Sequence, residues 1–179
     1  MLQIRIHGRG GQGAVTAAEL IAISAFKDGK ISQAFPSFGV ERTGAPVESY
    51  VRISDKEIRT REQVYEPDVL VVLDPTLLSV VDLAKGTSNK TKLIINTAES
   101  KEKIKINLPL ENIFTIDATK IALEIFGKNL ANTVILGAFA KDTKLITLKS
   151  LEEAIKEKFG DKGKDIVEKN IKAIEKAYA

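Results

Sequence analysis

Runs of apolar residues alternate along the chain with segments in which apolar residues recur at helical spacing. Continuous apolar runs are typical of strands that are buried on both faces of a parallel sheet. Strands are expected at residues 2–6, 31–35, 69–73, 92–96 and 113–116. Helices are expected at residues 14–26, from 74 to near 86, at 118–126, 133–140 and 150–159, and around a stripe of Val167, Ile171, Ile174 and Tyr178.

The segment 47–53 has a different pattern, because its apolar side chains alternate with Glu48, Tyr50 and Arg52. Period-two alternation predicts a strand with one buried face and one solvated face. Turn residues at 54–56 lead into 57–59, which predicts an antiparallel hairpin. The chain is therefore expected to have an α/β fold: a doubly wound, Rossmann-like, mostly parallel sheet with an antiparallel hairpin addition and C-terminal helices.

Several residues have side chains that favour helix ends. The expected N-caps are Asp74, Asp117, Asn132 and Ser150, the last in a capping box with Glu153. Gly127 is expected to end the helix that Asp117 begins. The helix 133–140 has little polar face, so we expect it to be buried against the sheet or against another subunit.

The composition excludes several classes of protein. At 179 residues the chain is expected to form a single domain, 1–179, in the cytoplasm, because it has no apolar run of membrane-spanning length and no signal-peptide pattern. Its net charge of +3 comes from interspersed charges, which argues against nucleic acid as a partner. Without cysteine, the chain itself can ligate no iron–sulfur cluster through thiolates. The Lys-, Glu- and Ile-rich composition is typical of thermophiles.

A glycine motif, Gly8-Arg9-Gly10-Gly11-Gln12-Gly13, lies between the first expected strand, which ends at His7, and the first helix. Glycines at such a junction let backbone N–H groups at a helix N-terminus approach a phosphate closely. The motif therefore predicts a site for a phosphate or pyrophosphate. His7 itself is expected to be packed rather than catalytic, because it closes a buried strand.

Two features modify this prediction. A dinucleotide-binding fold usually has an acidic residue about 20 residues beyond the glycines, at the end of the second strand. The strand 31–35 has none, and the nearest acid, Glu41, follows a proline and a glycine. The loop 35–46, with two prolines, two glycines, two aromatics and Arg42, is expected either to carry function or a partner contact, or simply to link two strands.

Five stretches in this order and spacing resemble the gamma subunits of the 2-oxoacid:ferredoxin oxidoreductases, most of all the pyruvate enzyme. The similarity extends from residue 1 to about residue 160. The stretches are Gly8–Gly13, Phe35–Gly44, Val51–Ser54, Pro67–Leu73 and Asn132–Ala138.

The resemblance implies a subunit of an enzyme that converts pyruvate, coenzyme A and oxidised ferredoxin into acetyl-CoA, carbon dioxide and reduced ferredoxin. Thiamine diphosphate, magnesium and [4Fe–4S] clusters would lie on the partner alpha, beta and delta subunits, with ferredoxin as the electron acceptor. This chain would carry no catalytic residue and no metal, and would help to bind and orient coenzyme A. The implied binding residues are Gly8, Arg9, Gly10, Gly11, Gln12, Gly13 and Arg42, with Arg9 as a charge partner of the phosphates.

Two other functions are consistent with the glycine motif. A free-standing enzyme or regulator could bind a dinucleotide on the same turn, although the missing acid argues against it. A purely structural subunit could use the glycines only to make a tight turn.

Overall fold

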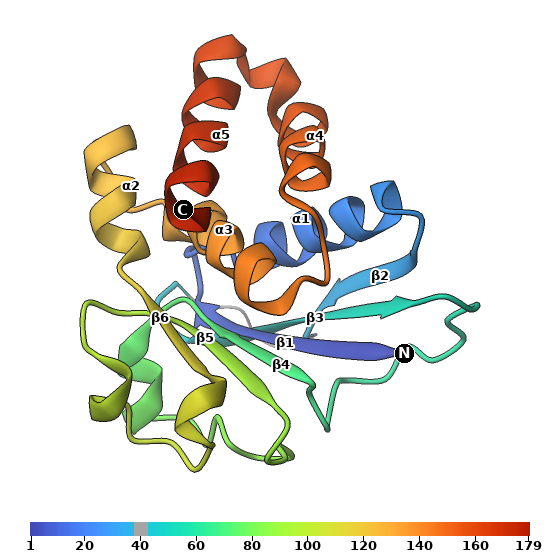
Figure 1. The fold of residues 1–179 in the computed structure, drawn as a ribbon, viewed down its shortest axis with the longest axis vertical. Helices are drawn as coiled ribbons and strands as arrows, with labels where there is room; N and C mark the ends of the chain where they lie inside the picture. The colour runs from blue at the N-terminus through green and yellow to red at the C-terminus, as the bar shows by residue number, and fades with distance from the viewer. Residues whose placement is uncertain (38–42) are drawn as a thin grey trace.

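The computed structural model describes residues 1–37 and 43–179, and its centre is a six-stranded sheet of order β2-β3-β1-β4-β5-β6 (Figure 1). The strands are β1 (Leu2–Arg9), β2 (Ile31–Pro36), β3 (Pro46–Ser54), β4 (Val69–Val72), β5 (Lys92–Asn96) and β6 (Ile113–Ile116). The pairs β1–β4, β4–β5 and β5–β6 are parallel, whereas β3 is antiparallel to both β1 and β2. The α/β architecture with a mostly parallel sheet is confirmed.

The α-helices lie together on one face of the sheet with η4 between α4 and α5, and the other 3-10 helices and loops cover the opposite face (Figure 1). The helices are α1 (Ala14–Lys27), α2 (Ala118–Phe126), α3 (Ala131–Thr143), α4 (Leu148–Phe159) and α5 (Lys164–Tyr178). The 3-10 helices are η1 (Pro75–Ser79), η2 (Lys101–Lys103), η3 (Leu110–Asn112) and η4 (Gly160–Lys162). None of the helices within the described ranges has the length and apolarity needed to cross a membrane.

Each face of the sheet has its own apolar core, as expected for strands buried on both sides. On β4, Val69 and Val71 belong to the core under the α-helices, and Leu70 and Val72 belong to the core on the opposite face. Leu77, from η1, is fully buried in that second core. Successive side chains of β4 therefore point into opposite cores, so this one strand supports both layers of the fold.

The long helix expected after Asp74 does not form. Asp74 does cap a helix, because its side chain accepts from the Thr76 N–H, but only η1 follows. The chain then turns, so that Leu83 packs in the second core and its carbonyl, like that of Lys85, accepts from the buried Arg5 side chain. Tertiary contacts override the local helical pattern.

The hairpin expected at 47–59 is also wrong, because residues 57–59 form no strand and β3 pairs with β2 and β1 instead. The polar side of β3 is not solvated: Tyr50 and Arg52 are only 2% and 1% exposed. Arg52 Nη2 donates to the carbonyl oxygen of Glu62 at 2.6 Å, which holds the segment after β3 beneath the sheet.

The helix 133–140 is confirmed as a buried element within the slightly longer α3. Val134, Ile135, Leu136 and Phe139 are fully buried by the chain itself, so α3 offers no free apolar face to another subunit. At Gly137 the backbone of α5 approaches closely, since an added Cβ would lie 2.1 Å from the Ile174 carbonyl oxygen.

Two of the expected helix caps are wrong. Asn132 lies inside the first turn of α3, and its side chain donates to the Gly13 carbonyl at 3.4 Å. The cap of α4 is Thr147, which accepts from the N–H of Ser150, so Ser150 is a first-turn residue. The caps at Asp117 and Gly127 are confirmed on α2.

Candidate functional site

The glycine turn connects the C-terminal end of β1 to the N-terminus of α1, next to the end of β4. β1 continues to Arg9 rather than ending at His7, because Gly8 and Arg9 still pair with β3. Gly11 and Gly13 have φ angles of 92° and 79°, and Gly13 is the residue before α1. The left-handed conformation explains why glycine is needed at both positions.

Several backbone N–H groups of the turn already have acceptors inside the chain. The N–H of Gly10 donates to the Ala45 carbonyl, that of Gln12 to the Arg9 carbonyl, and that of Arg9 to Oε1 of Gln12 at 2.7 Å. Within residues 1–37 and 43–179, no acceptor is found for the N–H groups of Gly11 and Gly13. These two groups, at the positive end of the α1 dipole, are the donors that the turn can offer to an anion.

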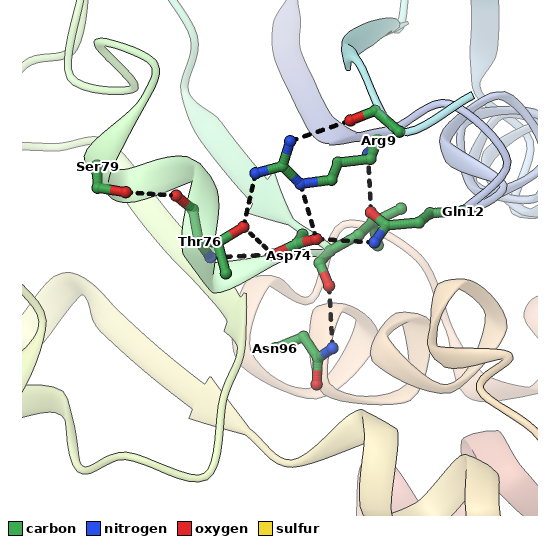
Figure 2. A network of polar contacts seen from close by, with 8 residues as sticks. Arg9, Gln12, Asp74, Thr76, Ser79 and Asn96 are labelled. Atoms are coloured by element: carbon green, nitrogen blue, oxygen red, sulfur yellow. Dashed lines mark hydrogen bonds and ion pairs between the residues drawn. The ribbon is translucent and has the colours of Figure 1, made fainter. Parts of the chain in front are cut away.

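Arg9, Gln12 and Asp74 form a polar cluster beside the turn (Figure 2). Oδ2 of Asp74 accepts from Arg9 Nε at 3.1 Å and from Gln12 Nε2 at 2.8 Å. The two terminal guanidinium nitrogens of Arg9 donate to the Gly44 carbonyl at 3.0 Å and to Thr76 Oγ1 at 2.8 Å. Each side-chain nitrogen of Arg9 therefore has an acceptor within the protein.

The Asp74 carboxylate is stabilised in its charged form. Partial burial acts to raise its pKa, but the hydrogen bonds from Thr76 and Gln12 and the positive charge of Arg9 together outweigh burial and hold the pKa below its usual range. Thr76 contributes both its N–H, at 3.0 Å, and its hydroxyl, at 2.6 Å, to Oδ1. At neutral pH, Arg9 and Asp74 are thus a compensated ion pair.

The sequence reasoning identified Asp74 only as a helix cap and missed this cluster. A usable signal was its position, since an acid directly after an apolar parallel strand lies at the sheet edge where α/β proteins bind ligands. Arg42 lies in the segment 38–42, outside the described residues. The neighbouring residues Thr43 and Gly44 do reach the turn: Gly10 and Thr43 form a bridge, and the Gly44 N–H donates to the Gly10 carbonyl at 3.1 Å.

One hollow adjoins the turn, and a second shares a wall residue with the first. A small one, of about 70 Å³, is lined by Gly11, Gln12, Leu73, Asn129, Ala131 and Asn132. A larger one, of about 470 Å³, also has Asn132 in its wall and lies between α1, the α2–α3 connection and the α4–α5 pair. Its lining combines apolar side chains such as Phe126 and Phe159 with Lys128, Lys162 and Lys169.

Comparison with known proteins identifies the family. The model of the pyruvate ferredoxin/flavodoxin oxidoreductase family matches residues 3–179. The chain belongs to this family. The chain is 54% identical to the pyruvate/ketoisovalerate oxidoreductases common subunit gamma of Thermococcus kodakarensis over 180 residues, covering 99% of this chain and 96% of that protein.

Solved structures of the same fold agree with the family assignment. The pyruvate oxidoreductase subunit PORC of Thermotoga maritima superposes with a TM-score of 0.84 at 36% identity, covering 99% of this chain and 94% of that one. A 2-oxoglutarate:ferredoxin oxidoreductase from Magnetococcus marinus, with 2-oxoglutarate, coenzyme A and succinyl-CoA bound, has a TM-score of 0.73 at 21% identity. It covers 98% of this chain and 30% of its own, so it is similar in fold alone.

The other candidate groups for chemistry, a histidine and a metal site, do not add to the turn. His7 is 2% exposed and accepts a hydrogen bond from Arg5 Nε, as expected for a packed residue. Among the described residues, no group of three His, Cys, Asp or Glu side chains is placed to hold a metal ion. Among the described residues, the glycine turn combines N–H groups without an acceptor with an adjoining small hollow.

Proposed function

We propose that this chain is the gamma subunit of a cytoplasmic, multisubunit pyruvate:ferredoxin oxidoreductase and that it helps to bind and orient coenzyme A. The observation that carries the proposal is the glycine turn, where the N–H groups of Gly11 and Gly13 have no acceptor among the described residues and precede the N-terminus of α1. Such donors fit the phosphates of coenzyme A.

The proposed enzyme rests on the relatives. The Thermotoga maritima protein is named as a pyruvate oxidoreductase subunit, which favours pyruvate as the substrate here. The Thermococcus kodakarensis protein is named as a subunit common to pyruvate and ketoisovalerate oxidoreductases. A subunit shared between two 2-oxoacid enzymes is consistent with a 2-oxoacid pocket on other chains, here proposed to be the alpha, beta and delta subunits.

The composition of this chain is consistent with redox cofactors on the partner subunits. Thiamine diphosphate, magnesium and [4Fe–4S] clusters are proposed to belong to the partner subunits, because this chain has no cysteine to ligate a cluster. The partner cofactors would supply decarboxylation and electron transfer to ferredoxin. This chain would hold the nucleotide part of coenzyme A, so that binding far from the thiol places the thiol at the reacting centre.

The larger hollow, which shares Asn132 with the hollow at the turn, supports the proposal of a nucleotide ligand. Its volume of about 470 Å³ is within the range of sites for small molecules, and it shares Asn132 with the hollow at Gly11. Its lining has the ammonium groups of Lys128, Lys162 and Lys169 and one carboxylate, that of Asp165, which binds Lys169 at 2.8 Å, so the lining is positive on balance. A ligand with a flat ring and several phosphates is complementary to this combination.

The topology argues against the dinucleotide alternative. In a dinucleotide-binding fold the second strand lies beside the first and presents an acid to the ribose. Here β3 separates β2 from β1, so the end of β2 is displaced from the turn by one strand. A free-standing dinucleotide-binding protein would bind NAD or FAD as the isolated chain, which equilibrium binding can test.

The proposal is tested in the complex purified from native cells, assayed for coenzyme A-dependent ferredoxin reduction with a panel of 2-oxoacids. Gly11→Leu adds a bulky side chain at the turn, and no described residue lies within 4 Å of its Cβ, although the positive φ makes the substitution strained. Losing hydrogen bonds to a charged phosphate should raise the KM for coenzyme A about 10- to 100-fold. The KM for pyruvate should not change.

Gly29→Leu is the matched control. Gly29 also has a positive φ, 78°, and open space at its Cβ, but it lies beyond the opposite end of α1. It should carry the same backbone strain without the effect on coenzyme A. If the Gly11 variant assembles and leaves the KM for coenzyme A at the control value, the turn is purely structural.

A further inference from the structure

We propose that Asp74 is a positioning residue for the anion site of the glycine turn, acting through Arg9 and Gln12. The inference rests on the proposed function, since it assumes that the turn binds the phosphates of coenzyme A. It differs from the role that the family resemblance implies for Arg9, which is direct contact with phosphate. Asp74 and Arg9 set the shape and the charge of the turn, and the backbone N–H groups bind the anion.

The shape of the turn depends on Asp74 because its carboxylate connects the end of β4 to the glycine turn and, through Arg9, to Gly44. Oδ2 holds the side chains of Arg9 and Gln12, which begin and end the central part of the turn (Figure 2). Gln12 in turn accepts from the Arg9 N–H, and Arg9 donates to the Gly44 carbonyl. Through these bonds, Asp74 holds Arg9 and Gln12 on either side of the Gly10–Gly11 pair. It also holds Gly44, through Arg9.

Asp74 is itself held in place at the end of β4. The carbonyl of the preceding residue, Leu73, accepts from Asn96 Nδ2 at 2.9 Å at the end of β5. The Leu73 N–H donates to the His7 carbonyl of β1 at 2.8 Å. Asn96 also binds Thr119 in the first turn of α2, through its Oδ1 and Nδ2 atoms. The turn is thereby tied to the ends of the central strands.

The charge of the cluster matters because a carboxylate near a phosphate site repels the ligand unless it is neutralised. The side chains of Arg9 and Asp74 are only 26% and 15% exposed, so solvent screens them incompletely. Arg9 compensates the Asp74 charge with Nε, and its other two nitrogens are bound to Gly44 and Thr76. All three guanidinium nitrogens are therefore engaged within the protein, which fixes the orientation of the group and leaves one N–H on each terminal nitrogen.

The two roles of Arg9 predict different results in a double-mutant cycle. As a positioning residue, Arg9 protects the site from the Asp74 charge, so Arg9→Ala leaves an uncompensated carboxylate beside the phosphates. Removing Asp74 as well then restores part of the binding. As a direct phosphate ligand, Arg9 would be lost equally in the single and double variants, and Asp74→Ala would free the guanidinium and lower the KM for coenzyme A.

The experiment uses the assembled complex with Asp74→Ala, Arg9→Ala and the double variant. We expect Asp74→Ala to raise the KM for coenzyme A about tenfold, as for the loss of charge-assisted hydrogen bonds. Arg9→Ala should raise it more, and the double variant should bind coenzyme A at least about threefold better than Arg9→Ala. The kcat at saturating coenzyme A and the KM for pyruvate should stay unchanged, which a general loss of structure would not produce.

Asp55→Ala is the control for removing an aspartate from an ion pair, because Asp55 binds Lys30 at 2.6 Å on the exposed surface after β3. If Asp74→Ala prevents assembly, Gln12→Ala breaks the link to Oδ2 while keeping the ion pair, and it should raise the KM for coenzyme A in the same direction. A raised KM in the Gly11 variant with an unchanged or lowered KM in the Asp74 and Gln12 variants overturns this inference alone. No effect in any of these variants overturns the proposed function.

Discussion

Nε of Arg5 donates a hydrogen bond to Nε2 of His7 at 3.0 Å, and both side chains are buried beneath β1. The bond requires a lone pair on Nε2, so the imidazole is neutral. Glu48 Oε1 lies 3.6 Å from Nδ1, but burial first and the Arg5 charge second lower the pKa of His7 to about 3. His7 and Glu48 are therefore not an ion pair at neutral pH.

The depressed pKa of His7 predicts how stability depends on pH. The unfolded chain takes up a proton near pH 6.5 and the folded chain near pH 3, so the folded state loses stability as the pH falls between these values. The slope contributed by one such group approaches about 1.4 kcal/mol per pH unit.

His7 is the one histidine in the sequence, so its imidazole signals can be followed by NMR without assignment. We expect no titration of the folded protein above about pH 4. His7→Gln should flatten the fall in unfolding free energy between pH 6 and pH 4. A midpoint near pH 6 in the folded protein would contradict this prediction.

The contact between α3 and α5 predicts a strong effect of a single methyl group. Gly137→Ala places a Cβ against the Ile174 carbonyl and within 2.9 Å of the Ala177 Cβ. We expect the free energy of unfolding to fall by about 1–3 kcal/mol, because two packed backbones must separate. Denaturant unfolding measures the change.

Gly160→Ala serves as its comparison, because Gly160 is in the right-handed helical region and no described residue lies within 4 Å of an added Cβ. This variant should be neutral or stabilised by about 0.4–1 kcal/mol. Equal effects at both positions would show that helix propensity, rather than the α3–α5 contact, decides the outcome.

Asp28 joins the end of α1 to the start of α4. Its carboxylate accepts from the Thr147 N–H at 2.7 Å, the Thr147 hydroxyl at 2.8 Å and the Ser150 hydroxyl at 2.9 Å. Asp28→Ala should lower the free energy of unfolding by about 1–3 kcal/mol, since a charged acceptor and part of the α4 cap are lost. Thermal unfolding of Asp28→Ala beside Asp55→Ala separates this effect from that of losing an exposed carboxylate.

The parallel strands could be predicted from the sequence because their burial on both faces leaves continuous apolar runs. The strands at 69–73 and 92–96 could be predicted without knowledge of distant contacts. The surroundings of β3 could not be predicted, because Arg52 is covered by a segment that follows the strand and turns back beneath it. The alternation of polar and apolar residues predicts that one face of β3 is polar. That this face is buried depends on the segment folded against it.

The glycine motif located the turn but not what holds it. Arg9 and Asp74 are separated by 65 residues, and their contact depends on β1 and β4 being parallel neighbours. The Asp74-Pro75 pair correctly predicted a helix cap, because a cap acts within one turn. It wrongly predicted a long helix, because packing of the following residues in the second core decides where the chain goes next. The motif therefore reveals the donors, and the topology reveals their support.

The pairing of Arg9 with Asp74 affects how an anion would be attracted to the turn. A free guanidinium acts as a full charge over several ångströms, but here it is cancelled by a carboxylate 3.1 Å away. What remains is the partial charge of oriented peptide groups, which falls off within about one helical turn. The turn would then select a ligand at contact, by whether its oxygens fit the backbone, rather than by drawing any negatively charged molecule from a distance.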